Sequence, residues 1–416
     1  MKIKYLVLSL IAIIAIGCNS DDNNNPDALN YSEGISVNSQ AALDSVVQSI
    51  GPDRNALKYL IIGLNFNGPT DITSLASLSN IVSIESISIQ NCPQLTSLEG
   101  LHNVREAGVI GIGNTGITDL NGLRSLATIT GVSNGIIGPL SLFNNSALVN
   151  LNGLQKLTNI PTLSIAVCSN FQSFHGLENC RLIGSLTVNN CPNLISLENI
   201  SIEVTGGCQF YTTGITTLSG VKIVSGASVF INFNPVLTSF GNAFENATNL
   251  RLFICEGNPS LVSLEGLETL TTIGEVDIRY NDLLQSLNGL QSVTSTNNIG
   301  VTANNSLLSL NGLHSLTTAN SIRINYNPAL TSIGALSNVT SLHAIGIGYN
   351  PSLTSLNGIE NISSESYYVT VESNASLKDL CTLVPILSLI SPDSSVSGNY
   401  NPVTLSTLNS GNCSIE

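Results

Sequence analysis

The sequence predicts a mainly β fold, a right-handed β-solenoid of about 14 coils with a repeat of about 23 residues that is rich in leucine. One observation is a direct repeat: IRINYNPALTSI (322–333) returns 23 residues later as IGIGYNPSLTSL (345–356). Another is composition, because 42% of the 416 residues are hydrophobic and only 10% are charged. Much apolar surface must therefore be buried, while Asn, Ser and Thr keep the exterior soluble. Like charges on adjacent rungs of such a stack would repel.

An apolar residue opens an L-T-S-L-like segment in every coil and sets the register of the array. These markers are Ile72, Leu95, Ile117, Leu148, Phe171, Leu194, Ile215, Leu237, Leu261, Leu284, Leu307, Leu330, Leu353 and Leu377. Their spacing is 21 to 24 residues except for one interval of 31, between Ile117 and Leu148. The Gly-rich ITGVSNGIIGPL lies in that interval, so one coil is expected to carry a protruding loop.

Two further columns accompany the markers. Apolar residues eight and six positions before the marker, such as Ile322 and Ile324, predict short strands with one buried face. Three positions before the marker stands an Asn or a Cys, and only Thr212 interrupts this column: Cys92, Asn114, Asn145, Cys168, Cys191, Asn234, Asn258, Asn281, Asn304, Asn327, Asn350 and Asn374. An inward Asn can satisfy backbone groups where the coil turns. The cysteines in this column are interpreted as its members and not as reactive thiols.

These columns resemble the receptor L-domain, the leucine-rich solenoid of insulin- and EGF-receptor ectodomains, and related leucine-rich surface proteins of bacteria. The resemblance rests on NCPQLTSLEGL, NCPNLISLENI, NPSLVSLEGL and NPALTSIGAL. It implies one solenoid over residues 35–380, favoured over two tandem domains because the period hardly changes. In such proteins the extended sheet is the recognition surface.

The segment ISVNSQAALDSVVQSI resembles the helix that opens an L-domain and predicts an N-terminal helical cap. Asn38 and Ser39 are candidate N-caps. The apolar positions keep helical spacing: Leu43, Val46, Val47 and Ile50. A cap is needed because the end of an open stack exposes an unpaired strand edge.

Residues 381–416 depart from the repeat and are predicted to form a C-terminal cap. Cys381 and Cys413 both lie in this segment. In an exported protein such a pair is expected to form a disulfide that closes the cap.

Residues 1–17 are predicted to be a lipoprotein signal peptide. Lys2 and Lys4 precede a 12-residue apolar stretch that is too short to span a bilayer. The stretch closes on AIGC, which resembles the bacterial lipobox and implies that Cys18 is lipidated and becomes the mature N-terminus. The alternative is an ordinary secretory signal with an incidental cysteine.

Residues 18–34 are Asn- and Asp-rich and predict a disordered tether. Ser20, Asp21 and Asp22 resemble the export signal of surface lipoproteins from Bacteroidetes-type bacteria. This resemblance implies the outer membrane, with the protein facing the cell exterior. The alternative is a solvated linker whose acidity has no role.

One outward column contains a candidate ligand-binding set. Four positions before the marker stand aromatic residues, and charged residues lie on the same strands: Phe233, Tyr280, Tyr326 and Tyr349, with Asp277, Arg279 and Arg323. Exposed Tyr side chains can stack on sugar rings or anchor a protein partner. The competing interpretation is that the rings stack on one another and stabilise the sheet.

Charge and motif content exclude other functions. A formal net charge of −14 without a basic cluster gives no expectation of nucleic-acid binding. Four scattered His residues and the lack of metal-ligand spacing give no expectation of a metal, a cofactor or catalysis. The function predicted is a lipid-anchored surface protein that binds or adheres to a protein or glycan. Alternatives are a glycan-binding accessory lipoprotein of a polysaccharide uptake system and a purely structural surface protein.

Overall fold

The computed structural model describes residues 31–32, 34–49, 56–63, 68–131, 139–198, 200–363 and 367–415. The chain forms two compact units, described separately below. The N-terminal unit comprises the described residues of Met1–Leu194 and Asn199–Ile202, and the C-terminal unit those of Ile195–Glu198 and Glu203–Glu416. The predicted signal peptide, Cys18 and most of the predicted tether lie outside the described residues, as do residues 132–138 of the predicted protruding loop. Within the described ranges, no helix is both long and apolar enough to span a membrane.

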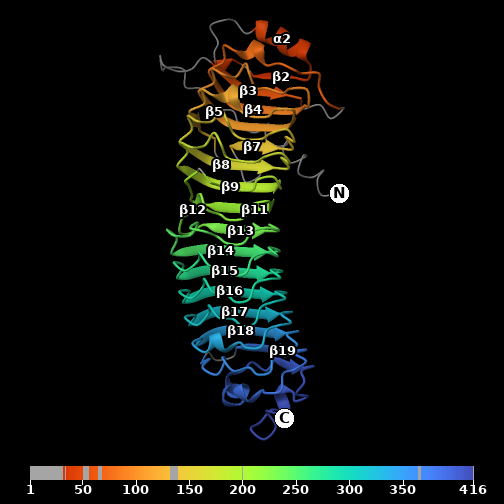
Figure 1. The fold of residues 1–416 in the computed structure, drawn as a ribbon, viewed down its shortest axis with the longest axis vertical. Coiled ribbons are helices and arrows are strands. Elements are labelled where there is room, and N and C mark those ends of the chain that lie inside the picture. The colour runs from red at the N-terminus through yellow and green to blue at the C-terminus, as the bar shows by residue number, and fades with distance from the viewer. Residues whose placement is uncertain are drawn as a thin grey trace. The chain divides into compact units, whose positions relative to one another are not determined.

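The N-terminal unit is a stack of parallel strands (Figure 1). Its elements are β1 (Tyr31–Ser32), β2 (Ile35–Val37), α2 (Gln40–Ser49), β3 (Ala56–Ile62), η1 (Ala76–Leu78), β4 (Ser83–Cys92), β5 (Glu106–Thr115), η2 (Asn121–Leu123), β6 (Thr128–Ile129), β7 (Leu140–Phe143), β8 (Asn159–Ala166) and β9 (Leu182–Cys191). Strand β10 (Ile202–Val204) begins in this unit and ends in the next. Both β6 and β7 lie within the 31-residue interval, and both pair in parallel with β5.

The C-terminal unit repeats the same construction with greater regularity (Figure 1). Its remaining elements are β11 (Gly207–Thr213), β12 (Val221–Ile223), β13 (Ser228–Asn232), β14 (Asn249–Glu256), β15 (Thr272–Arg279), β16 (Ser295–Thr302), β17 (Thr318–Asn325), η3 (Gly334–Leu336), β18 (Ser341–Gly348), β19 (Tyr368–Glu372), η4 (Cys381–Leu389), β20 (Ser395–Ser397) and η5 (Leu405–Thr407). From β13 to β20, each strand pairs in parallel with the next along the chain.

The core of each unit consists of the predicted apolar columns. The markers from Ile72 to Leu377 are fully buried, and in strands such as β17 the buried Ile322 and Ile324 alternate with outward residues. Burying such a side chain contributes about 1.5–3 kcal/mol. The prediction of a mainly β, parallel solenoid of leucine-rich coils is confirmed, with about 15 turns in place of 14.

The N-terminal end is covered by α2. The Ser39 hydroxyl accepts a hydrogen bond from the backbone N–H of Ala42 (3.2 Å), which places the N-cap at one of the two predicted residues. Leu43 is fully buried, while Val46 and Val47 are half-buried. The helix packs against β2 and η1, so it covers the first coils as the helical spacing predicts.

At the C-terminal end the stack continues beyond the predicted boundary at residue 380. Strand β20 pairs in parallel with β19, and Asn399 accepts a hydrogen bond from the backbone N–H of Asn374 (3.1 Å). Cys381 and Cys413, the predicted pair, form a disulfide. The backbone N–H of Leu380 also donates to the carbonyl of Cys413 (2.7 Å), so the end of the chain folds back onto this coil.

The inward Asn column forms a buried hydrogen-bonded ladder in the C-terminal unit. In each rung the Asn Oδ1 accepts the backbone N–H of the ladder residue in the preceding coil, which is Thr213 for Asn234 and an Asn for the others, and its Nδ2 donates to a strand carbonyl of that coil. These rungs are fully buried: Asn234, Asn258, Asn281, Asn304, Asn327, Asn350 and Asn374. The ladder satisfies backbone groups that the turn would leave unpaired. In the N-terminal unit, buried Cys92, Cys168 and Cys191 occupy the same column.

Two assignments to this column were wrong. Asn114 does not lie in the ladder, and Thr115 takes its place: both the N–H and the hydroxyl of Thr115 donate to Oδ1 of Asn145 (3.1 and 2.7 Å). Likewise Thr213, and not Thr212, donates to Asn234. In these two coils the ladder residue stands two positions before the marker, and in the other coils it stands three positions before. Counting back three positions from the marker therefore gave the neighbouring residue.

The residue immediately before each ladder position adopts a left-handed backbone conformation. Its φ lies between 52° and 58° in every non-glycine case: Asn91, Asn114, Asn144, Val167, Asn190, Thr212, Phe233, Tyr280, Ala303, Tyr326, Tyr349 and Ser373. This conformation suits Asn and is strained for bulky side chains. It is held because the N–H at this position donates to a carbonyl of the next coil, as Tyr280 does to Thr302 (3.1 Å). All four predicted aromatic residues stand in this strained column.

Candidate functional site

A groove runs over the outward face of the C-terminal unit. This outer groove has a volume of about 590 Å³. It is lined by Leu252, Ile254, Glu275, Val276, Asp277, Arg279, Tyr280, Asn298, Ile299, Gly300, Thr302, Ser321, Arg323 and Asn325. Four of the seven predicted ligand-binding residues are therefore brought together, namely Asp277, Arg279, Tyr280 and Arg323, whereas Phe233, Tyr326 and Tyr349 do not line the groove.

The parallel register explains why these residues meet. Asp277 on β15, Gly300 on β16 and Arg323 on β17 are partners across adjacent strands. Gly346 on β18 extends the row. Because neighbouring strands lie about 4.8 Å apart, side chains 23 residues apart in sequence become neighbours on one face.

The two arginines of the site differ in their partners. Arg279 contacts Glu256 (Nη2–Oε2, 3.0 Å) and Asp277 (Nη1–Oδ2, 3.3 Å), and its Nε is buried without a hydrogen-bond partner in the described structure. Burial raises the pKa of Asp277, and Arg279 opposes that rise. Arg323 is exposed and makes no ion pair or hydrogen bond with any described residue. The groove thus contains one neutralised arginine and one open guanidinium.

The aromatic column divides into stacked and unstacked rings. The rings of Tyr326 and Tyr349 lie parallel at 4.5 Å between centroids, and Phe233 makes an edge contact with Tyr211 at 5.1 Å. These pairs fit the interpretation that the column stabilises the sheet. Tyr280 has no aromatic partner among the described residues, and 54% of it is exposed. Its coil neighbours in the column are Gly257 and Ala303, so its ring stands alone at the edge of the outer groove.

Replacing Tyr280 by Asn should stabilise the protein by about 0.5–1 kcal/mol, because Asn tolerates the left-handed conformation and no ring contact is lost. Thermal or urea unfolding of the variant measures the change. Tyr326→Asn is the matched control: it relieves the same strain but breaks a ring stack worth about 0.5–1.5 kcal/mol, so little net change is expected. Equal destabilisation by both changes would contradict this assignment of strain.

Sequence reasoning missed the small and polar residues of the groove. Gly300, Thr302, Ser321 and Asn325 carry no motif, but writing the coils beneath one another places them around Arg323. A second groove of about 280 Å³ continues on the other side of Arg323 and shares Ser321, Arg323 and Asn325 with the first. The sheet face is therefore hollowed across the strands from β14 to β19.

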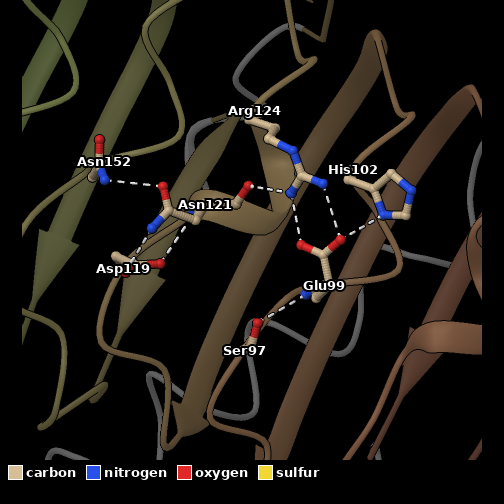
Figure 2. A network of polar contacts seen from close by, with 7 residues as sticks. All are labelled: Ser97, Glu99, His102, Asp119, Asn121, Arg124 and Asn152. Carbon is tan, nitrogen blue, oxygen red and sulfur yellow. Dashed lines mark hydrogen bonds and ion pairs between the residues drawn. The ribbon is translucent and has the colours of Figure 1, made fainter.

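A separate polar network links corners of the N-terminal unit (Figure 2). Glu99 accepts two hydrogen bonds from Arg124 of the next coil (2.6 and 3.0 Å), and His102 Nδ1 lies 2.9 Å from the same carboxylate. The hydrogen bond from Arg124 holds the pKa of Glu99 below its usual value. Beside it, Asn152 donates to Asn121 (2.9 Å). The network joins successive coils.

No group of three or more His, Cys, Asp or Glu side chains in the described ranges could hold a metal ion. Three of the buried cysteines outside the disulfide, Cys180, Cys208 and Cys255, are not poised for reaction either. Burial raises the pKa of the Cys180 thiol to about 11 and those of Cys208 and Cys255 to about 12. A thiol that stays protonated is a poor nucleophile and a poor metal ligand.

No protein-family model matches the chain, and no curated protein matches it. Among solved structures it is similar to a leucine-rich repeat protein of Bacteroides eggerthii, with 14% identity, a TM-score of 0.39 and coverage of 83% of this chain and 66% of that chain. It is also similar to a leucine-rich repeat protein of Bacteroides thetaiotaomicron, with 14% identity, a TM-score of 0.38 and coverage of 84% and 50%. A third match is the mouse RP105/MD-1 complex, with 18% identity, a TM-score of 0.36 and coverage of 83% and 68%. The chain spans less than two thirds of the first two, and such identities are too low to transfer a ligand.

Proposed function

We propose that this protein is a lipid-anchored surface protein that binds a macromolecular ligand in the outer groove of its C-terminal unit. The observation that carries the proposal is the open guanidinium of Arg323 between two connected grooves. A purely structural role for this sheet face would not account for grooves around an arginine that has no ion pair. A ligand that supplies the missing partner gives this arrangement a use.

The form of the site favours an elongated ligand. The two grooves share Ser321, Arg323 and Asn325 and follow the stacking direction over six strands. Five intervals of about 4.8 Å give a length of about 24 Å. A chain molecule can use such a length, whereas a small metabolite would fill only part of it.

The anchoring part of the proposal rests on the first 22 residues. The signal-like segment 1–17, Cys18 and the acidic residues after it support attachment of the protein to the outer membrane by lipid, facing the cell exterior. A groove in the C-terminal unit would then be offered to ligands outside the cell.

Blocking the groove tests this function. Ser321 lies on the floor shared by both grooves, and Ser321→Trp should abolish binding in a panel of purified glycans and extracellular proteins. Thr162→Trp is the control, since Thr162 holds the same place in β8 of the N-terminal unit, with the same partial burial. The proposal fails if no ligand binds, or if both variants bind as well as the unmodified protein. A structural surface role would then be the better explanation.

A further inference from the structure

Arg323 has no hydrogen bond or ion pair in the described structure, although its positive charge acts at longer range to lower the pKa of Asp277. The chain has 27 acidic and 13 basic residues, so a basic side chain is surrounded by potential partners. Arg279, two strands away, is neutralised by Glu256 and Asp277. Arg323 faces the same groove and has no ion pair in the described structure. Its planar fork of donors matches a carboxylate in geometry as well as in charge.

The glycines beside Arg323 are not required by the backbone. Gly346 is not in the left-handed region, and a Cβ at this position would meet no atom within 4 Å. A Cβ at Gly300 would meet the Asp277 carboxylate at 3.4 Å and the carbonyl oxygen of Val276 at 3.9 Å, which are ordinary contacts. Glycine inside a strand costs about 0.5–1 kcal/mol and marks places where another molecule approaches the backbone closely. These two positions keep space open on both sides of the guanidinium.

The lining also contains several polar, uncharged side chains. Asn298, Thr302, Ser321 and Asn325 present amides and hydroxyls toward the groove, and the unstacked ring of Tyr280 stands at its edge. Amides and hydroxyls can exchange hydrogen bonds with sugar hydroxyls, and an exposed ring can stack on the face of a sugar. A protein partner would instead need deep apolar pockets for its anchor residues.

The negative net charge of the protein limits the charge density of an anionic ligand. A net charge of −14 repels a densely charged polyanion, and Glu275 and Asp277 lie on the same groove. An isolated carboxylate among neutral sugars can reach Arg323 without placing further negative charge against these acids.

We infer that the outer groove binds an acidic polysaccharide in which carboxylated sugars stand among neutral ones, with Arg323 taking the carboxylate. This inference rests on the function proposed above and specifies its ligand. Arg323 acts as the residue that selects acidic over neutral chains, and Gly300 and Gly346 give the sugar ring access to it.

The test measures binding of uronic-acid oligosaccharides by calorimetry. Probes are partly methyl-esterified oligogalacturonate, its fully methyl-esterified form and, as a densely charged control that should bind more weakly, mixed mannuronate–guluronate chains in which every sugar carries a carboxylate. The full-length protein should bind the partly esterified chain, and full esterification should weaken binding about tenfold or more, the size expected for loss of a charge-assisted hydrogen-bonded pair. Arg323→Gln should cause the same loss without changing the midpoint of unfolding, and Arg323→Lys should restore only part of it.

Matched glycine variants separate access from stability. Gly346→Val should weaken binding by closing the space beside Arg323. Gly111→Val is its control, because Gly111 holds the same place in β5 of the N-terminal unit and its Cβ would meet atoms only at 3.9 Å (the Ile87 carbonyl oxygen) and 4.0 Å (Gln90 Nε2), which is ordinary contact. The inference is overturned if Arg323→Gln binds the partly esterified chain as tightly as the unmodified protein, or if that chain does not bind.

Other outcomes separate the inference from the proposed function. A neutral glycan or a protein that is lost in Ser321→Trp and Gly346→Val but is unaffected by Arg323→Gln would leave the groove as the binding site and refute the acidic-sugar assignment. Absence of any ligand from the groove would refute both.

Discussion

Replacing Asn304 by Ala should lower the free energy of unfolding by about 3–5 kcal/mol. Asn304 is fully buried, its Oδ1 accepts the backbone N–H of Asn281 (3.1 Å), and its Nδ2 donates to the carbonyl of Ile278 (3.0 Å). Alanine leaves both backbone groups buried without a partner, and each such group costs about 1–3 kcal/mol. Urea unfolding followed by circular dichroism measures the difference.

The adjacent residue provides the control for this prediction. Asn305 is exposed, and its side chain donates only to Asp282 (2.7 Å), so Asn305→Ala should change stability by less than about 0.5 kcal/mol. Asn304→Cys should lie between the two, because Cys168 already serves in this column with its thiol 3.9 Å from the carbonyl of Leu142. Equal effects of alanine at 304 and 305 would show that the ladder contributes nothing to stability.

Removing the disulfide with Cys381→Ala and Cys413→Ala together should destabilise the C-terminal end by about 3–4 kcal/mol. The bond closes a loop with a sequence separation of 32, and the loss of chain entropy in the unfolded state scales with that length. Because contacts in a solenoid are between neighbouring coils, the loss should be concentrated near β19 and β20. Hydrogen exchange of the amides in these strands measures it.

A reducing agent provides the comparison. Dithiothreitol should destabilise the unmodified protein by the same amount and leave the double variant unchanged. If the unmodified protein exchanges equally fast with and without the reductant, the bond has no stabilising role. The carbonyl of Cys413 would then retain the end through its hydrogen bond from Leu380 alone.

The periodicity of the sequence was sufficient to predict the architecture. Buried positions such as Ile322 and Ile324 recur at a fixed distance from each marker, and hydrophobic period alone fixes which face of a strand points inward. The ladder was predicted from its residue type, since Asn is unusual inside a core unless it satisfies backbone groups. Asn114 and Thr212 were misassigned because a one-residue deletion is invisible until the strand partners are known.

The left-handed column and the groove were not predicted. Four positions of this column are aromatic, and aromatic residues do not indicate a left-handed backbone conformation in a sequence, whereas Gly or Asn normally does. The groove is open because Gly300 and Gly346 have no side chains to fill the space beside Arg323. A search of the sequence for functional side chains does not find such glycines. Of the seven proposed binding residues, Asp277, Arg279, Tyr280 and Arg323 line the outer groove.

The direction of the Asn ladder has a mechanical consequence for the C-terminal unit. Every Asn offers its N–H to the coil that follows it, from Asn234 through Asn374 to Asn399. A tensile force on the last coil would therefore break one rung at a time, and each detached coil would uncover the next N–H in line. The disulfide between Cys381 and Cys413 lies at the end where such peeling would start. A force applied to the C-terminal end would accordingly meet the disulfide before it reached the first rung of the ladder.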